Sequence, residues 1–224
     1  LMTAQAHTQS SYDVIVVGSG AGAMTSALFA ADQGLSVLIV EKSDRYGGTS
    51  AISGGGIWIP NNHYFKALGG NDSPELSMQY LKAATGEHAD EGRLRAYVEH
   101  APQMIKTLTQ NSHVRYAVAD KYPDYYPHLP GALPGGRTLD PELFDTSLLA
   151  EELPNLRKPS PSTLLMGRIA WTARDAHTAM ARSFGWQWLI FKLMARYKLD
   201  FKWRRKSKYD RRAALGSSLV ASLR

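Results

Sequence analysis

Apolar and polar positions near the start of the chain follow first the spacing of a strand and then that of a helix. Residues 12–17 form a short, mostly β-branched apolar run, and residues 18–22 form a glycine turn. Small and apolar residues then recur at helical spacing over 21–33, and a second apolar run over 36–40 ends at Glu41. A strand, a helix and a strand within about thirty residues predict a right-handed parallel unit, the start of a Rossmann-like α/β fold.

After the first sixty residues the pattern becomes one of helices and loops. Ser73 and Pro74 suit the N-cap and first position of a helix. Apolar residues keep a helical stripe over 94–108, which Pro102 is expected to kink or restart. We therefore interpret residues 61–210 as a largely helical excursion, with loops, from the α/β core.

The end of the chain, residues 211–224, has apolar side chains at helical spacing, but no strand follows. Because two parallel strands cannot bury both faces of their sheet unaided, we expect an amino-terminal fragment. In this interpretation 12–60 holds the dinucleotide unit, 211–224 returns to its core, and a substrate and catalytic domain lies beyond 224. The polar segment 1–11 is expected to be disordered, and it lacks the features of a secretory signal, so a cytoplasmic location is expected.

Charge and cysteine content narrow the chemistry. The chain has no cysteine, which excludes disulfides, zinc ribbons and iron–sulfur ligation, and no metal site is expected. The net charge is +6, but residues 196–212 alone carry nine Lys or Arg against two Asp, so the rest of the chain is close to neutral. A basic face across the fold is not supported, and nucleic acid is not an expected partner. The most apolar stretch, 184–199, is interrupted by polar and charged residues and predicts no membrane span.

The glycine turn after the first strand has the spacing G-x-G-x-x-A. Its first glycine permits a tight turn, its second lets the backbone approach a pyrophosphate, and the small final alanine allows close packing of helix on strand. Glu41, at the end of the second strand, is placed to accept hydrogen bonds from an adenosine ribose. The order of these features favours a dinucleotide site over the alternative, an ordinary turn. The expected binding residues here are Gly18, Ser19, Gly20, Ala21, Gly22, Ala23, Glu41 and Lys42.

A second glycine-rich segment, residues 47–56, follows shortly after Glu41. Its two glycine clusters let backbone lie against a long cofactor, while the hydroxyls between them supply hydrogen bonds. We interpret the segment as a contact with FAD, and the alternative is a glycine-rich surface loop. The expected binding residues are Gly47, Gly48, Thr49, Ser50, Ser53, Gly54 and Gly55.

These two segments, VIVVGSGAGAMTSALFAADQGLSVLIVEK and GGTSAISGGGIWIPNN, resemble the 3-ketosteroid Δ1-dehydrogenase branch of the fumarate reductase and succinate dehydrogenase flavoprotein superfamily. The resemblance covers nearly the whole chain. Covalently flavinylated members of the superfamily carry a histidine where this chain has Thr49, so the resemblance implies noncovalent FAD. Later segments that are similar to the branch are 101–104, 122–127, 134–137 and 210–212.

The resemblance implies desaturation of the C1–C2 bond of a 3-oxosteroid. A hydride would leave C1 for flavin N5, a tyrosine would remove a proton from C2, and an external electron acceptor would reoxidise the flavin. A tyrosine base needs a second tyrosine to stabilise its phenolate, and the resemblance assigns this supporting role to Tyr125 or Tyr126 in preference to Tyr122. The alternative is that these rings only pack the Pro-, Gly- and Tyr-rich loop 122–137. The main base would lie beyond residue 224, so the fragment alone is expected to be inactive.

A basic and aromatic stretch, residues 186–212, suits a helix at an anionic membrane surface, and the alternative is a helix packed on its own core. Two further functions remain open. One is a soluble fumarate- or urocanate-reductase-like flavoprotein acting on small carboxylates, although the aromatic loop favours a flat apolar substrate. The other is a non-catalytic membrane-surface module that keeps the nucleotide fold.

Overall fold

The computed structural model describes residues 11–224, so the predicted disordered segment 1–11 lies outside the described residues except for Ser11. The predicted strand, helix and strand are confirmed as β1 (Val14–Val17), α1 (Ala21–Asp32) and β2 (Val37–Val40). The strands are parallel, with Val14 opposite Val37 and Val17 opposite Val40. Each strand begins one or two residues later than predicted, where Asp13 and Ser36 exchange hydrogen bonds that involve their side chains.

The helix α1 ends as the sequence predicts. Gln33 is its C-cap, and Gly34 has a φ of +82°, a left-handed conformation that glycine adopts without steric cost. Met24 and Ala27 are its buried residues. On the outer side of the unit Ile15 and Val17 are 61% and 83% exposed, so the two-stranded sheet has an uncovered apolar face.

The excursion contains more strand than the sequence predicts. The strands β3 (Ile57–Trp58), β4 (Tyr116–Val118) and β5 (Thr138–Pro141) form an antiparallel sheet in the order β3-β5-β4. A second antiparallel pair joins β6 (Phe144–Asp145) to β7 (Arg212–Ala213). The sequence did not reveal these strands because runs of two to four residues are too short to establish an alternating pattern.

Two helices of the excursion form a hairpin. The helix α3 (Pro74–Thr85) begins as predicted, because the Ser73 hydroxyl accepts a hydrogen bond from the Leu76 N–H and Pro74 occupies the first turn. The helix α4 (Glu91–Asn111) is continuous across Pro102, so of the two predicted outcomes the restart is wrong and the kink stays a prediction. Proline removes one backbone hydrogen bond, and the buried Ala101 and Ile105 beside it show that packing holds this stretch of the helix in place.

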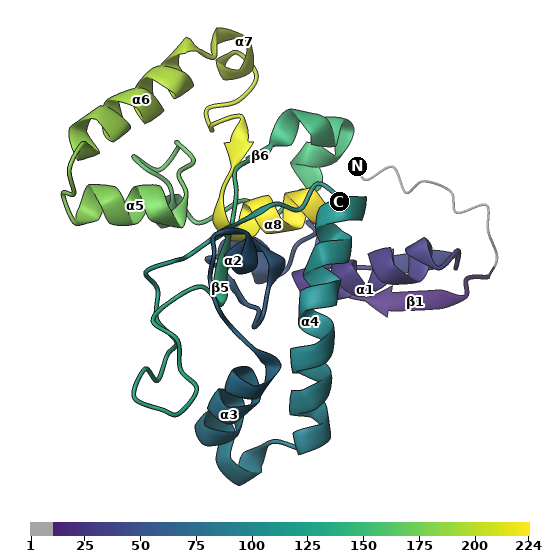
Figure 1. Cartoon of the computed structure of the whole chain (residues 1–224). Coiled ribbons are helices and arrows are strands. Elements are labelled where there is room, and N and C mark those ends of the chain that lie inside the picture. The colour runs from purple at the N-terminus through teal and green to yellow at the C-terminus, as the bar shows by residue number, and fades with distance from the viewer. Residues whose placement is uncertain (1–10) are drawn as a thin grey trace.

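The remaining helices complete the frame. Figure 1 shows α5, α6 and α7 as an arm at the opposite side of the view from α1 and β1, with α8 near the centre. Every residue of α8 except its first is buried, and it packs against η1, α1 and β5. Its predicted helix therefore exists, although it starts four residues after 211. These elements are α2 (His63–Ala67), α5 (Ala173–Met180), α6 (Trp186–Leu199), α7 (Phe201–Arg204), α8 (Leu215–Leu223) and the 3₁₀ turns η1 (Ser50–Ile52), η2 (Gly86–His88), η3 (Thr146–Asn155) and η4 (Pro161–Thr163).

Candidate functional site

The glycine turn at the end of β1 has the backbone that a phosphate-binding loop requires. Gly18 has a φ of +97°, and its N–H donates to the carbonyl of Val40 at 2.7 Å, which ties the turn to the end of β2. Gly20 is the N-cap of α1 and brings no side chain to the helix end. A Cβ at Gly22 would meet no atom within 4 Å, so the space beside the first turn is open. The helix thus presents its positive end without a side-chain cap, which suits an anion.

Ser19 links three parts of the site. Its backbone N–H donates to Glu41 Oε2 at 3.0 Å, and its hydroxyl donates to the same oxygen. The same hydroxyl accepts a hydrogen bond from the Gly47 N–H at 2.9 Å. Because Ser19 is only 3% exposed, these bonds replace water and fix the glycine turn against both β2 and the second glycine segment.

Glu41 is held in its ionised form. The hydrogen bond from the Ser19 side chain, and next the Ser43 N–H at 3.0 Å, lower the pKa of Glu41 below its ordinary value. A carboxylate has about four lone-pair positions, and these bonds leave acceptor capacity for a ribose hydroxyl. The predicted ribose-binding position is therefore compatible with the geometry.

The two glycine-rich segments that the sequence analysis singled out lie against each other. The Ala21 N–H donates to the Ser50 hydroxyl at 3.0 Å. A Cβ at Gly20 would lie 3.4 Å from Ser50 Oγ, and one at Gly48 would lie 3.7 Å from Gly20 Cα. At Gly47, with a φ of +114°, a Cβ would lie 2.8 Å from Ala51 Cβ. Of these three positions only Gly47 lacks room for a side chain, whereas a Cβ at Gly20 or Gly48 would make ordinary van der Waals contacts.

Other predicted cofactor residues lie at the surface of this cradle. Lys42, Thr49, Ser53 and Gly54 are exposed, whereas Gly55 is buried. A continuous cradle with an uncapped helix end, an ionised acceptor and exposed hydroxyls fits the pyrophosphate, ribose and isoalloxazine parts of FAD.

Residues 211–224 were expected to return to the core, but sequence reasoning missed the contacts by which Gly216 and Ser217 support this cradle from behind. The Gly216 N–H donates to the Ser53 carbonyl at 3.0 Å, and the Ser217 hydroxyl donates to the Ala51 carbonyl at 2.8 Å. A Cβ at Gly216 would overlap the Ser50 carbonyl oxygen. The Gly-Ser pair is visible in the sequence, but nothing local connects it to a segment more than 160 residues earlier.

The predicted tyrosines stand on a separate loop. Tyr125 is 79% and Tyr126 is 51% exposed. Tyr122 and Tyr125 meet edge to face at 6.4 Å, and a hydrogen bond with Tyr125 raises the pKa of Tyr122. The Tyr126 N–H donates to the Tyr80 hydroxyl at 3.2 Å. Within residues 11–224, none of the hydrogen bonds or ring contacts of these three tyrosines reaches the 47–56 segment.

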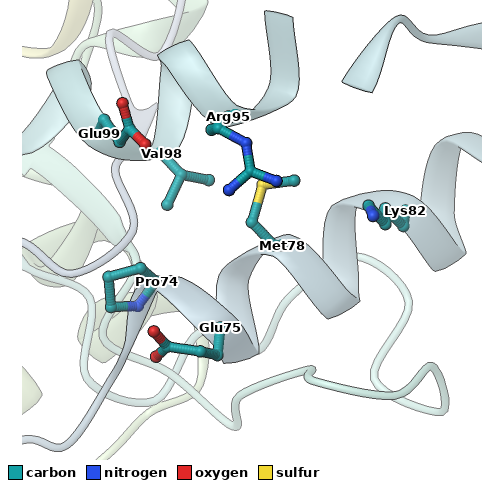
Figure 2. A pocket seen from close by; sticks show the side chains of 7 residues that line it. All are labelled: Pro74, Glu75, Met78, Lys82, Arg95, Val98 and Glu99. Carbon is teal, nitrogen blue, oxygen red and sulfur yellow. The ribbon is translucent and has the colours of Figure 1, made fainter. Parts of the chain in front are cut away.

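A groove between α3 and α4 is a second candidate for binding (Figure 2). It has a volume of about 180 Å³ and contains none of the predicted site residues. Its lining carries two acidic and two basic side chains, and the basic ones, Lys82 and Arg95, both pair with Glu91, so the rim has no excess of positive charge. This groove does not suit a flat apolar substrate. Its lining residues are Pro74, Glu75, Met78, Lys82, Arg95, Val98 and Glu99.

Metal sites and membrane spans are two other classes of feature to consider in the described part of the chain. Across residues 11–224, no three His, Cys, Asp or Glu side chains gather in a group that could hold a metal ion. Among the helices of the same residues, none combines the length and the apolar character that a bilayer crossing requires.

Comparison with known proteins shows the family to which this chain belongs. Residues 13–204 match the family model for the FAD binding domain. The chain is 44% identical over 213 residues to 3-oxosteroid 1-dehydrogenase from Comamonas testosteroni, covering 95% of this chain and 37% of that protein. It is 42% identical to the 3-oxosteroid 1-dehydrogenase of Mycolicibacterium smegmatis, over 68% of this chain and 27% of that protein.

A solved structure agrees. The crystal structure of 3-ketosteroid Δ1-dehydrogenase from Sterolibacterium denitrificans in complex with 1,4-androstadiene-3,17-dione matches with a TM-score of 0.92 at 53% identity, over 95% of this chain and 38% of that one. The chain therefore spans less than two fifths of the length of these relatives. With its cradle and these matches, the chain belongs to the FAD binding domain family, and within that family to the 3-ketosteroid Δ1-dehydrogenase branch.

Proposed function

We propose that this chain supplies the FAD-binding part of an enzyme that desaturates the C1–C2 bond of a 3-oxosteroid. The observation that carries the proposal is the joining of the G-x-G-x-x-A turn and the 47–56 segment into one cradle through Ser19 and Ser50. The 53% identity to a dehydrogenase whose crystal structure contains 1,4-androstadiene-3,17-dione supports the substrate class. The α/β core thus binds the cofactor, and the steroid is the substrate.

Each part of the cradle has a distinct task in this proposal. Bound FAD supplies the two-electron acceptor that no side chain can provide. The first turn of α1 binds the pyrophosphate through its N–H groups and dipole, and Glu41 accepts hydrogen bonds from the ribose. Thr49 stands where covalently flavinylated relatives carry histidine, and the chain has no cysteine, so the FAD is held noncovalently. An external electron acceptor then completes the turnover.

The supporting tyrosine is Tyr125 or Tyr126. A tyrosine base loses its proton at neutral pH only if its phenolate is stabilised, and a second tyrosine hydroxyl is the simplest donor. The exposure of both rings supports this role, because a hydroxyl buried among its own partners would not reach a substrate site. The hydrogen bond with Tyr125 raises the pKa of Tyr122, so Tyr122 is its donor. The Tyr122 proton is thus already used, which makes Tyr122 the weaker candidate.

Anaerobic flavin reduction tests the proposal. A 3-oxo-4-ene steroid is expected to bleach the flavin absorbance of the FAD-loaded enzyme, expressed with its complete polypeptide, whereas succinate is expected to leave it unchanged. Bleaching by a dicarboxylate alone would instead support the carboxylate-reductase alternative. If the protein binds no flavin, the proposal that it is a flavoenzyme is wrong. Acid precipitation is expected to release all of the FAD into the supernatant, because a covalent linkage would keep it in the pellet.

A second function, docking at a membrane surface, rests on the arm formed by α6 and α7. Trp188 and Phe191 stack at 5.2 Å and are 68% and 59% exposed, and Phe201 is 63% exposed. Exposed aromatics beside a basic stretch match the headgroup region of an anionic bilayer. Docking would give the enzyme access to a water-insoluble steroid.

Vesicle flotation tests this docking. The protein is expected to float with vesicles of phosphatidylcholine and phosphatidylglycerol but not with phosphatidylcholine alone. The triple variant Lys202→Glu, Arg204→Glu and Arg205→Glu is expected to lose flotation. A matched variant that changes three basic side chains away from the arm to Glu is expected to retain it. Equal flotation of both variants would contradict docking through the arm. The control positions are Lys66, Arg93 and Lys106.

A further inference from the structure

A buried cluster of three charged side chains lies at the base of the tyrosine loop, residues 122–137. Arg137 Nη2 lies 2.7 Å from Asp72 Oδ1, and Arg137 Nη1 lies 2.8 Å from Asp124 Oδ2. The three side chains are exposed by 2% or less. Asp72 precedes α3, Asp124 follows Tyr122 in the loop, and Arg137 lies just before β5. One guanidinium therefore ties the loop to two other elements.

Further hydrogen bonds, several of them to uncharged groups, complete the cluster. Arg137 Nε donates to Asp72 Oδ2 at 2.9 Å, which makes that pair bidentate, and Arg137 Nη1 also donates to the Gly131 carbonyl at 3.0 Å. Trp58 Nε1 donates to Asp124 Oδ1 at 2.7 Å, and the Leu133 N–H donates to Asp124 Oδ2 at 2.9 Å. Two buried carboxylates against one cation are tolerable because these donors stabilise the excess negative charge.

Electrostatics and packing both favour the ionised cluster. Burial raises the pKa of Asp72 and is the largest single effect, but the hydrogen bond from Arg137, the N–H groups of Asn61 and Ser73 and the charge of Arg137 together outweigh it and hold that pKa below its ordinary value. The guanidinium also lies over the rings of Trp58 and Tyr80, 5.4 and 5.7 Å from their centroids. The carboxylates thus bond to the edge of the Arg137 guanidinium, and the aromatic rings pack against its face. Together they define a single orientation for this side chain.

This cluster closes the loop while leaving its tip free. The Asp124 N–H donates to the Leu133 carbonyl at 3.0 Å, so the two sides of the loop meet there. A Cβ at Gly135 would overlap the Asp120 carbonyl, so the two ends of the loop pack too closely for a side chain at this position. Tyr125 and Tyr126 directly follow Asp124 and remain exposed. A rigid base next to two exposed hydroxyls is the arrangement that positions reactive groups.

We propose that Arg137 is a positioning residue for the tyrosines of this loop: its bonds to Asp72 and Asp124 fix Tyr125 and Tyr126 in the orientation that the reaction requires. The proposal rests on the proposed function, because it presumes that one of these tyrosines supports the base. Arg137 does not touch the tyrosines. It acts through Asp124 and through the carbonyl of Gly131.

The Arg137→Lys variant of the FAD-loaded enzyme, expressed with its complete polypeptide, tests the proposal. Lysine keeps the charge but cannot form the fork that reaches both carboxylates. The steroid-dependent rate of flavin reduction is expected to fall about 100-fold, since misplacement by an ångström costs on that order, while KM and FAD content stay within about twofold. Trypsin is expected to cleave after Lys121, at the start of the loop, at least tenfold faster.

A milder variant and a matched control keep the test decisive. Trp58→Phe removes one donor to Asp124 and is expected to lower the rate by several-fold in a protein that folds. Arg196→Lys changes an ion pair outside the loop, with Asp210 at 3.1 Å and an Arg196 side chain that is 23% exposed, and is expected to leave the reduction rate and the cleavage unchanged. A wild-type rate and wild-type cleavage in Arg137→Lys, or an equal effect of Arg196→Lys, would overturn the proposal. If Arg137→Lys does not accumulate, a wild-type rate in Trp58→Phe overturns it.

Two further variants separate this proposal from the one on which it rests. Tyr125→Phe and Tyr126→Phe are measured in the same assay. If neither lowers the rate of flavin reduction, the role of the tyrosines is wrong, whatever Arg137 does. If one lowers it and Arg137→Lys leaves both rate and cleavage unchanged, the tyrosine role stands and the positioning role of Arg137 is wrong.

Discussion

Gly216→Ala is the substitution that most directly tests how α8 supports the FAD cradle. A Cβ at this position would overlap the Ser50 carbonyl and lie 2.8 Å from the Ser53 carbonyl oxygen, where ordinary contacts begin near 3.4 Å. Backbone must therefore move by more than half an ångström, and overpacking of this kind costs about 1–3 kcal/mol. Ser50 is the residue whose hydroxyl holds the Ala21 N–H at the start of α1, so the displacement reaches the pyrophosphate site.

The expected result is weaker binding of FAD. If the whole cost falls on the bound state, the Kd for FAD rises roughly 5-fold to 150-fold. Titration of the apoprotein with FAD, followed by quenching of flavin fluorescence, measures the change, and thermal unfolding with and without FAD shows how much falls on the fold. Ser222→Ala on the same buried helix removes only an intrahelical hydrogen bond and serves as the control. An unchanged Kd and Tm in Gly216→Ala would refute the reasoning.

Three further changes have expected outcomes. Because the pKa of Glu41 is lowered from 4.5, its contribution to FAD binding and to stability is present above that pH and is lost as the pH falls through its folded pKa. FAD release measured against pH is expected to show this step in the wild type, and the step should vanish in Glu41→Gln. Ser19→Ala removes the hydroxyl that donates to Glu41 and accepts from the Gly47 N–H. The free energy of unfolding, measured in urea, is expected to fall by about 1–3 kcal/mol. A smaller loss of stability than in an exposed serine variant would contradict the role of Ser19. Ile105→Ala, at a fully buried position, is expected to destabilise the fold by about 2–5 kcal/mol in urea, against a few tenths for the exposed Leu68→Ala, and comparable losses would count against the packing account.

The sequence by itself determined the parts of the protein that are encoded within a few residues. The βαβ unit, its glycine turn and the end of α1 near Gly34 follow from short-range periodicity and from conformations that favour glycine. The start of α3 at Ser73 and Pro74 is equally local. The family resemblance also lay in two contiguous segments, which is why FAD could be predicted before any contact was known.

Only the tertiary structure decided which distant residues meet. The strands β4 and β5 are too short to leave a pattern, and α4 continues through Pro102 because its packing outweighs a local rule. The support of the cradle by Ser217 and the buried pair of Arg137 with Asp72 join segments 166 and 65 residues apart. Local propensity acts over one or two turns of chain, whereas a buried charge cluster or a close backbone contact forms only when the whole fold brings its members together.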